Sequence, residues 1–500
     1  MGPVITTRPK LTSIGPPRLL AGLDGMDRLD RVNHLTVHGT PPAMRPEDLV
    51  ALAENTDLRG RGGAGFPFAR KVRAVIEAAE GRVARTAVVV NGSEGEPSCL
   101  KDTALLLHTP HLVLDGALLA ATALGAEEVA IGVHRGDVEQ SVREAIAERG
   151  ADARRVRVDR LPDRFVAGEG SALVAGLSGA PALPSGRKIR TSVSGLGGLP
   201  TLLSNTETFA QLAVAARMGA LPYRATGLPT EPGTVLLTVA GKWVVETPTG
   251  VPLAYVLQLC GLGPGQGVLV GGYHGRWLDP YSAAQTSISR ESLSAFNGVL
   301  GAGAVLPLPE GTCPVGETLR VTRWMAAETA GQCGPCVLGL PAIADTLAEV
   351  ERGAFGAMEA LRGSLGAVLR RGACSHPDGT SNFVASSLAA FPEDFAAHAG
   401  GAGCGRPVLG VLPVPSDGSP LALPPGPSAG GKDAESTEEL LVDWTLCQGH
   451  GLCADIVPDV VELGADGYPA KAVMAVPRQL RPQAVRAVRR CPALALRIQD

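Results

Sequence analysis

The sequence predicts a multidomain protein with both α/β and α+β units: a mixed α/β domain, a small α+β module, a helical bundle and a compact C-terminal unit. Three observations lead to this prediction. A chain of 500 residues is too long for one hydrophobic core. Strand and helix patterns alternate over residues 86–148, as is typical of a parallel α/β sheet. Residues 405–432 are crowded with proline, glycine and serine and separate the last unit from the rest.

The first half of the chain supplies the elements of the α/β domain. Residues 86–90 form a mostly β-branched run and residues 129–133 form a second apolar run, so we predict a strand at each. Four segments around them have helical periodicity: residues 45–53, 69–79, 112–124 and 138–148. The preceding residues, 1–42, are proline-rich, and we expect an irregular extension.

The second half has a different pattern. Residues 235–239 and 268–270 are apolar runs typical of strands, and residues 253–259 between them read as a short helix. These three elements indicate a small α+β module. Residues 317–369 are mostly helical in pattern, with cysteines at their start, which predicts a bundle.

The charge balance argues against a nucleic-acid or membrane-surface partner, because 45 lysine and arginine residues face 49 aspartate and glutamate residues. Residues 1–20 have no apolar core of signal-peptide length, and the most apolar stretch, residues 103–125, is interrupted by histidines, a proline and Asp115. We therefore expect a cytoplasmic protein with no transmembrane segment. Ten cysteines in that compartment indicate metal chemistry rather than disulfides.

The C-terminal cysteines carry the strongest single signal. Cys447 and Cys453 are separated by five residues, and Cys491 is followed at once by Pro492. A close group of cysteines plus a distant Cys-Pro pair is the arrangement that binds an iron–sulfur cluster. His450 lies midway between the first two cysteines, so three thiolates would suit a 3Fe–4S cluster, and His450 as a possible fourth ligand would suit 4Fe–4S. The Cys-Pro pair disfavours the alternative of unrelated free thiols.

Residues 447–498 resemble the single-cluster ferredoxins that supply electrons to monooxygenases in actinobacteria. The resemblance covers nearly the whole C-terminal unit. It implies a ferredoxin-like fold for residues 438–500, with Cys447, Cys453 and Cys491 as cluster ligands.

A glycine-rich loop at residues 60–65 fits the pattern G-x-G-x-x-G, but no strand precedes it, so the dinucleotide-binding context of that pattern is missing. Consecutive glycines still let a backbone lie against a flat ring or a phosphate. Lys71 follows in the next predicted helix, where it can neutralise a phosphate.

Three further loops follow, at residues 90–97, 168–173 and 200–208, and each alone reads as a turn at the end of a strand. Together and in this order with the glycine loop they resemble the FMN- and NADH-binding subunit of respiratory complex I and its relatives in soluble hydrogenases and formate dehydrogenases. The resemblance spans roughly residues 43–398. It implies these domains: an N-terminal extension (1–42), an FMN-binding α/β domain (43–230), a small ubiquitin-like module of the SLBB type (231–290), an iron–sulfur-binding helical bundle (291–404), a flexible linker (405–437) and the ferredoxin domain (438–500).

The resemblance also implies site residues. FMN-contacting positions match Gly62, Gly63, Lys71, Asn91, Glu94, Gly168, Glu169, Asn205 and Thr208. Glu96 matches a residue near the nicotinamide. The nicotinamide site departs from the family, because Gly170 replaces the second of two adjacent glutamates. Ser93, Phe165 and Arg190 also stand where the family has other residues.

The bundle cysteines depart from the family as well. The family has three closely spaced cysteines and a fourth far downstream, whereas this chain has Cys333, Cys336 and the distant Cys374, with Ala330 at the first position. A cluster here needs three-cysteine ligation or an outside ligand, for which Glu328 and His376 are candidates. We expect the remaining cysteines to be small buried or incidental residues: Cys99, Cys260, Cys313 and Cys404.

The resemblance implies an oxidoreductase that passes electrons from NAD(P)H through FMN to iron–sulfur clusters and on to a one-electron acceptor, with a redox protein as partner. Hydride transfer needs no side-chain acid or base, so no catalytic residue is named. The alternative is a redox adaptor that receives electrons from a partner protein and never binds NADH. Gly170 and Ala330 favour the adaptor, and the intact flavin loops favour the enzyme.

Overall fold

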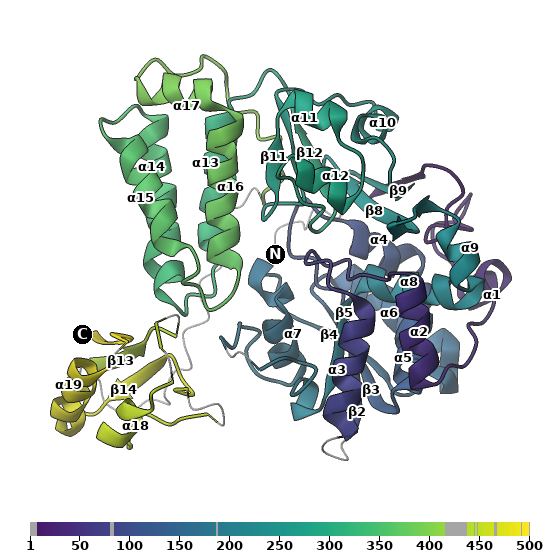
Figure 1. Cartoon of the computed structure of the whole chain (residues 1–500), viewed down its shortest axis with the longest axis horizontal. Helices are drawn as coiled ribbons and strands as arrows, with labels where there is room; N and C mark the ends of the chain where they lie inside the picture. The colour runs from purple at the N-terminus through teal and green to yellow at the C-terminus, as the bar shows by residue number, and fades with distance from the viewer. Residues whose placement is uncertain are drawn as a thin grey trace.

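The computed structural model has a mixed α/β architecture (Figure 1). It describes residues 8–80, 85–186, 189–415, 438–444, 446–447, 449–464, 468–491 and 493–499. Several predicted features lie outside the described residues: residues 1–7 of the extension, residues 416–437 of the linker, and Pro492.

A four-stranded parallel sheet organises the first large unit, in the order β4-β3-β2-β5. Its strands are β2 (Thr86–Asn91), β3 (Ala126–Val133), β4 (Val156–Arg160) and β5 (Thr201–Asn205). The chain steps outward from β2 to β3 and β4, then returns to place β5 on the other side of β2. The strand order therefore reverses between β2 and β5, and ligands of open parallel sheets bind beyond the carboxyl ends of the strands at such a point.

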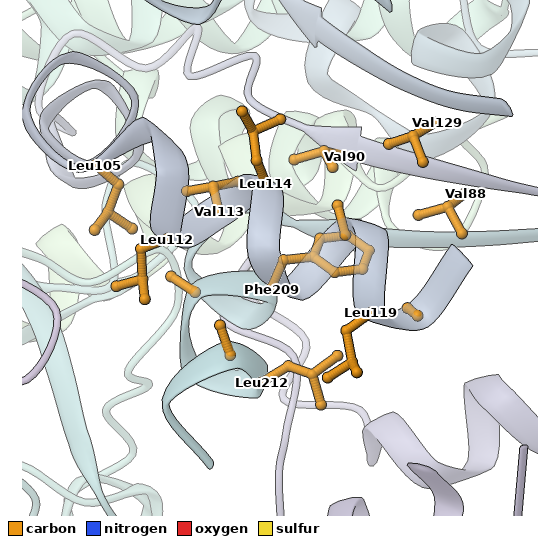
Figure 2. Packing of buried hydrophobic residues seen from close by; sticks show 14 of the residues in the cluster. Val88, Val90, Leu105, Leu112, Val113, Leu114, Leu119, Val129, Phe209 and Leu212 are labelled. Carbon is orange, nitrogen blue, oxygen red and sulfur yellow. The ribbon is translucent and has the colours of Figure 1, made fainter. Parts of the chain in front are cut away.

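Helices cover this sheet, as their amphipathic or apolar patterns require. They are α1 (Arg31–His38), α2 (Pro46–Asn55), α3 (Phe68–Glu80), α4 (Lys101–His108), α5 (Pro110–Ala123), α6 (Gly136–Arg149), α7 (Gly170–Leu177), α8 (Thr206–Met218) and α9 (Ala220–Arg224). Helix α5 is apolar nearly all round and buried along its length. It packs so closely on α8 that a side chain at Gly116 would collide with the backbone carbonyl of Phe209. Figure 2 shows the resulting core, with Phe209 between the helices and the strand residues Val88 and Val90.

A second, six-stranded sheet has the order β1-β9-β8-β12-β10-β11. Its strands are β1 (Lys10–Ser13), β8 (Thr234–Val239), β9 (Trp243–Pro248), β10 (Gly267–Val270), β11 (Arg276–Leu278) and β12 (Ala304–Leu308). Helices α10 (Leu253–Leu259), α11 (Pro280–Gln285) and α12 (Arg290–Ala295) accompany it, and the hairpin β6 (Gly227–Leu228) and β7 (Glu231–Pro232) precedes it.

The N-terminal extension is not irregular throughout, as the sequence pattern suggested. Residues Lys10–Ser13 pair in parallel with the edge strand β9, which satisfies backbone groups that the edge would otherwise expose. Strand β12 lies beyond residue 290, the predicted end of the small module, and it joins β8 to β10. Both pairings are long-range, so local sequence patterns did not indicate them.

The bundle consists of α13 (Pro314–Ala327), α14 (Leu340–Glu351), α15 (Ala357–Val368), α16 (His376–Ala390) and α17 (Pro392–Ala399), which share one apolar core. The first part of the predicted flexible linker packs against it, so the prediction of a free tether is wrong for residues 405–414. Leu412 is buried, and the buried Glu317 carboxylate accepts hydrogen bonds from the backbone N–H groups of Gly410 and Val411. We call residues 405–414 the strap.

The C-terminal unit is a three-stranded antiparallel sheet in the order β14-β13-β15. It contains β13 (Glu438–Val442), α18 (Leu452–Ile456), β14 (Val473–Val476), α19 (Arg481–Arg490) and β15 (Leu496–Gln499). A small core of its own, built around Leu440, Val457 and Ala484, holds it together.

Among the residues that the structure describes, no single helix is long and apolar enough to cross a membrane. Helices α4 and α5, bent by 95° at their junction, meet that criterion only as a pair and only by length and composition.

Candidate functional site

The carboxyl ends of β2 and β5, where the strand order reverses, each carry an asparagine. Asn91 and Asn205 are register partners at the ends of the two strands. The Asn91 side-chain amide donates to the carbonyl of Gly168 at 2.9 Å, which ties the predicted acidic loop to this edge. Asn205 begins α8, and its side-chain oxygen accepts from the N–H of Glu207 at 3.0 Å. The sheet therefore brings three of the predicted flavin loops to one place.

The glycine loop lies over the same edge. The backbone N–H of Arg61 donates to the Thr208 hydroxyl at 3.0 Å, and a Cβ at Gly62 would lie 3.2 Å from the Asn205 side chain. Gly63 has φ +117°, a conformation that residues with side chains rarely adopt. Gly62 and Gly63 are exposed, so a stretch of bare backbone faces outward at the switch point. Such a surface accepts a flat ring or a phosphate.

Lys71 projects from α3 to the end of β5. Its ammonium donates to the carbonyl of Leu203 at 3.1 Å. Burial lowers the pKa of Lys71, so a nearby anion would stabilise its charged form.

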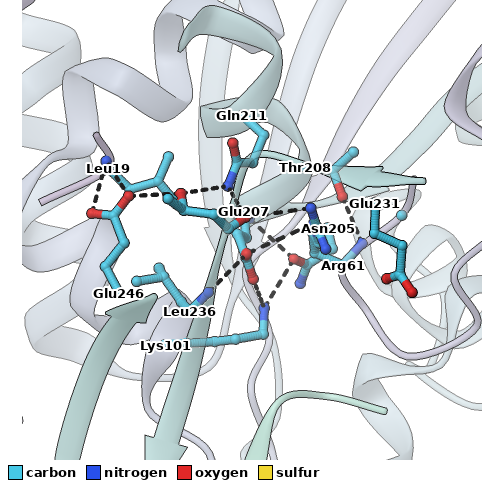
Figure 3. A network of polar contacts seen from close by, with 12 residues as sticks. Leu19, Arg61, Lys101, Asn205, Glu207, Thr208, Gln211, Glu231, Leu236 and Glu246 are labelled. Atoms are coloured by element: carbon cyan, nitrogen blue, oxygen red, sulfur yellow. Dashed lines mark hydrogen bonds and ion pairs between the residues drawn. The ribbon is translucent and has the colours of Figure 1, made fainter. Parts of the chain in front are cut away.

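Beneath the glycine loop lies a buried charge network that the sequence patterns did not reveal (Figure 3). The Lys101 ammonium lies 2.8 Å from Asp102, 3.2 Å from Glu207 and 3.2 Å from the Asn205 side-chain oxygen. Burial alone would lower the pKa of Lys101, but the surrounding carboxylates outweigh it and raise that pKa. Lys101 is 2% exposed. One feature of the sequence could have indicated this network: Lys101 and Asp102 are adjacent charged residues at the start of the otherwise mostly apolar helix α4, shortly after residues 90–97.

Arg61 is the second basic group of this network. Its side chain is buried and lies 3.9 Å from Glu207. Within the described part of the chain, its Nε and Nη1 atoms have no hydrogen-bond partner. Buried donors without partners are costly, so this guanidinium suits an anionic group placed beside the glycine loop.

Glu94 and Glu96 are both predicted to contact a cofactor, but their carboxylates accept hydrogen bonds from backbone N–H groups of the protein. The Glu94 carboxylate accepts from the N–H groups of Asp102 and Thr103 at the start of α4, at 3.1 and 2.9 Å. Glu96 accepts from the N–H of Tyr273 at 2.8 Å. Burial raises the pKa of each carboxyl to about 7. The two glutamates thus fasten α4 and the second sheet to the site.

Glu169 begins α7, where its carboxylate accepts from the N–H groups of Ser171 and Ala172 at 2.9 and 3.0 Å. The neighbouring Gly170 supplies no carboxylate. A Cβ at Gly170 would lie 3.0 Å from one methyl of Leu203, a contact that a small shift relieves. The acidic loop therefore has one carboxylate, and the N-terminus of α7 already binds it.

An aromatic and histidine cluster joins the α/β unit to the bundle. The Phe165 ring packs 4.9 Å from that of His274 and 5.1 Å from that of His376, measured between centroids. The N–H of Phe165 donates to Glu328 at 2.8 Å. Both ring nitrogens of the buried His376 are engaged, Nε2 with the Met325 carbonyl and Nδ1 with His274. Both nitrogens of His376 are thus engaged elsewhere, and one carboxylate oxygen of Glu328 is bound to the Phe165 backbone.

The bundle cysteines follow α13 directly. Cys333 and Cys336 are buried, and Cys336 lies in one π-helical turn (Pro335–Gly339). A hydrogen bond from the Cys333 thiol lowers the pKa of Cys336 to about 7. Burial raises the pKa of Cys374 to about 11, with a smaller contribution from the Glu169 carboxylate. The structure brings the three predicted ligands to one place, and the backbone of the buried Ala330 interacts with the Cys336 thiol there.

The C-terminal cysteines line one hollow, together with His450 and mostly apolar residues. The wall comprises Cys447, His450, Gly451, Leu452, Cys453, Pro469, Cys491, Ala493, Ala495 and Leu496. The N–H of Ala495 donates to the Cys491 sulfur at 3.3 Å, as amides around cluster thiolates do. Three thiols around an apolar hollow fit an iron–sulfur cluster.

The C-terminal unit contacts the rest of the protein beside the bundle cysteines. A Cβ at Gly334, between Cys333 and Cys336, would lie 3.6 Å from the Asp443 carboxylate. One at Gly186 in the α/β unit would lie 2.5 Å from the Trp444 ring, which packs directly on that glycine. The C-terminal unit therefore contacts the bundle beside its cysteines and also contacts the α/β unit.

Of the four remaining cysteines, Cys313 is buried, as predicted, and Cys404 is partly exposed. Cys313 and Cys404 lie together with His398 at the far end of the bundle. Cys99 and Cys260 are buried, in agreement with the prediction.

Three segments match known protein families. Residues 53–214 match the Nuo51 FMN-binding domain, residues 317–398 match the NADH-ubiquinone oxidoreductase-F iron-sulfur binding region, and residues 440–498 match the 4Fe-4S single cluster domain.

Similar proteins cover most of the chain. The F subunit of NADH-quinone oxidoreductase in Mycobacterium bovis is 30% identical over 393 residues, which cover 72% of this chain and 86% of that protein. The corresponding protein of Streptomyces coelicolor is 30% identical over 387 residues, covering 72% and 85%. In three dimensions, a crystal structure of NAD+-reducing NiFe hydrogenase in the H2-reduced state matches with a TM-score of 0.67 and 28% identity, over 78% of this chain and 68% of that chain.

Proposed function

Because the chain belongs to the family of the NADH-quinone oxidoreductase F subunits, we propose that it is an oxidoreductase that moves electrons from NADH through FMN and iron–sulfur clusters to a one-electron acceptor. When bound, FMN accepts hydride from a nicotinamide and releases electrons singly. The observation that carries the proposal is the convergence of the glycine loop, Asn91 and Asn205 at the strand-order reversal.

The chain's own residues account for flavin binding. The bare backbone at Gly62 and Gly63 offers the surface for the ring system, and Asn91, Gly168, Glu169, Asn205 and Thr208 shape the surrounding loops. Lys71 and the incompletely bonded Arg61 supply positive charge for the phosphate. Glu94 acts through α4, whose N-terminal N–H groups its carboxylate binds, and Glu96 matches a family position near the nicotinamide.

The family membership also implies the domain boundaries. Residues 43–230 form the FMN-binding domain, and the next unit, predicted at 231–290 and extended by β12, is a ubiquitin-like module of the SLBB type. The bundle carries Cys333, Cys336 and Cys374, and residues 438–500 form a ferredoxin domain with Cys447, Cys453 and Cys491. The acceptor of the electrons is a redox protein, and we propose that the reaction takes place in the cytoplasm.

One observation favours the alternative, a redox adaptor without NADH binding. Gly170 provides no carboxylate, and the single carboxylate of the loop, Glu169, already binds the N-terminus of α7. An adaptor would keep the flavin and both cysteine sets but take electrons from a partner protein.

Anaerobic mixing of the purified protein with NADH, and separately with NADPH, distinguishes the two functions. If the protein is the oxidoreductase, NADH reduces its flavin, and the flavin absorbance band is bleached after mixing. Gly170→Glu should strengthen NADH binding by restoring the missing carboxylate. Flavin that dithionite reduces but neither nucleotide reduces, in the native chain and in Gly170→Glu alike, would leave the adaptor as the function. A protein that releases no flavin on denaturation, even after incubation with FMN, would refute both.

A further inference from the structure

We propose that Cys313, His398 and Cys404 form a binding site for a zinc-type divalent cation at the end of the bundle opposite the Cys333 set. Cys313 precedes α13 and Cys333 follows it, and the 14 residues of α13 separate the two ends by about 20 Å. The site is therefore distinct from the proposed iron–sulfur centres.

The three residues come from different segments of the chain. Cys313 is the N-cap residue directly before α13, His398 lies in the last turn of α17, and Cys404 lies in the loop that leads into the strap. Cys313 is 2% exposed, whereas the other two are partly exposed. An ion can thus enter from solvent and bind a buried thiol on the inner side.

The distances suit one small cation. The Cys313 sulfur lies 3.3 Å from His398 Nε2, and the three ligand atoms all lie within 4.8 Å of one another. In a tetrahedral zinc site with bonds of about 2.3 Å to sulfur and about 2.0 Å to nitrogen, neighbouring ligand atoms are about 3.5–3.8 Å apart. Only small side-chain shifts separate the present arrangement from that geometry. Elsewhere in the described part of the chain, no other three histidine, cysteine or acidic residues meet this closely.

The surrounding groups orient the ligands. His398 Nδ1 lies 2.8 Å from the backbone carbonyl of Glu351, to which it donates, so the lone pair of Nε2 points to the two sulfurs. The N–H of Gly316 donates to the Cys313 sulfur at 3.3 Å, and the side chain of Arg406 interacts with Cys404. Groups of this kind donate to the sulfurs of metal-bound cysteines and fix their orientation.

The donor set selects the kind of ion. Two thiolates and one imidazole favour zinc and similar borderline-soft cations over magnesium or calcium, which prefer oxygen ligands. Two thiolate charges also neutralise a divalent cation. Three protein ligands leave a fourth position for water.

The location indicates a structural role. The N–H of Cys313 donates to the carbonyl of Pro407 at 2.8 Å, and the N–H of Leu409 donates to the Thr312 hydroxyl at 3.0 Å. Cys404 directly precedes the strap, and Cys313 lies on the bundle where the strap is hydrogen-bonded. A cation held by both residues would therefore fasten the start of the strap to the bundle.

Metal analysis of the holoprotein tests the site. We expect about one zinc per chain, alongside iron and flavin, in the native protein and in the matched control Cys260→Ser, whose thiol is buried in the second sheet unit. Cys404→Ser and His398→Ala should lose the zinc and keep their flavin and iron. Zinc that persists in both variants, or native protein without zinc after growth with added zinc, would overturn the proposal.

Zinc-edge X-ray absorption of the native protein gives an answer that does not depend on whether the variants fold. The proposal requires a shell of two sulfur ligands with nitrogen or oxygen completing it. A shell of three or four sulfurs would show zinc in the iron–sulfur sites and would contradict the proposal. A disulfide between Cys313 and Cys404, found by peptide mapping of protein purified without air, would contradict it as well.

Discussion

The chain has two sets of three cysteines, and they differ in what surrounds the position of a fourth cluster ligand. In the bundle, Cys333 and Cys336 are buried and Cys374 is partly exposed, and we infer from the family pattern that the buried Ala330, with only a methyl group, stands at that position. The two alternatives that the sequence offers, Glu328 and His376, are hydrogen-bonded elsewhere.

In the C-terminal unit, the three cysteines are partly exposed around an apolar hollow, and the exposed His450 forms part of its wall. Equal numbers of thiols thus form a more deeply buried site with a methyl group at the inferred fourth position and a more exposed site with an imidazole in its wall. The difference suggests that the bundle set limits the cluster it can hold, whereas the C-terminal set is limited only by whether His450 binds.

The largest expected effect is the loss of the C-terminal cluster. Cys491→Ser should remove all iron from that unit and unfold it, because so small a core depends on its cluster for stability. Iron analysis and limited proteolysis of the full chain measure this, with Cys260→Ser as control. Cys447→Ser and Cys453→Ser should behave in the same way. A folded, protease-resistant unit without iron would contradict the ferredoxin assignment.

The next effect concerns the bundle site. Ala330→Cys should complete a four-thiolate set and raise the iron content and stability of the bundle cluster, because the new thiol replaces a methyl group on a residue that already contacts Cys336. Ala326→Cys, at the end of α13, is the matched control and should change neither. Iron content and the spectrum of the reduced protein provide the measurement, and equal behaviour of the two variants would show that Ala330 does not occupy a ligand position.

A smaller effect is expected at His450. If the C-terminal cluster is 3Fe–4S, His450→Ala should leave the iron content unchanged and the oxidised protein should be paramagnetic. If His450 is a ligand of 4Fe–4S, the variant should lose iron or shift in potential. Electron paramagnetic resonance of the oxidised protein separates the two states. A silent oxidised protein whose His450→Ala variant is unchanged in iron and potential would show that the fourth ligand lies elsewhere.

The smallest effect is kinetic. Trp444→Ala should slow electron transfer from the flavin to the C-terminal cluster several-fold. The Trp444 ring packs on Gly186 and thereby helps to hold the C-terminal unit against the α/β unit. Stopped-flow traces after NADH addition report the rate, and the exposed Tyr281→Ala serves as control. Equal rates in all three proteins would mean that this contact does not position the units.

Much of the fold was predictable because its elements have local signals. The helix at residues 253–259 and the strands around residues 86 and 235 agree with the structure. The N-terminal strand at residues 10–13 and the packed strap were not predictable, because partners more than 90 residues away determine both.

The candidate site shows the same division. Loop motifs indicated Asn91, Asn205 and the glycine loop, and the structure brings them together. Lys101 lies in a helix that reads as apolar core, so its role became evident only from the three polar groups around it. Cys313 and His398 are 85 residues apart and have no shared spacing pattern, so the sequence alone gives no sign that they meet.

The most direct test of the account is whether electrons from NADH reach the C-terminal cluster. The measurement is rapid-freeze electron paramagnetic resonance of the full chain after anaerobic addition of NADH, with Cys491→Ser identifying the C-terminal signal and dithionite defining full reduction. The account predicts that flavin bleaching is followed by reduction of the C-terminal cluster, and that Cys491→Ser bleaches its flavin without that signal. A C-terminal cluster that dithionite reduces but that stays oxidised while NADH bleaches the flavin would contradict it.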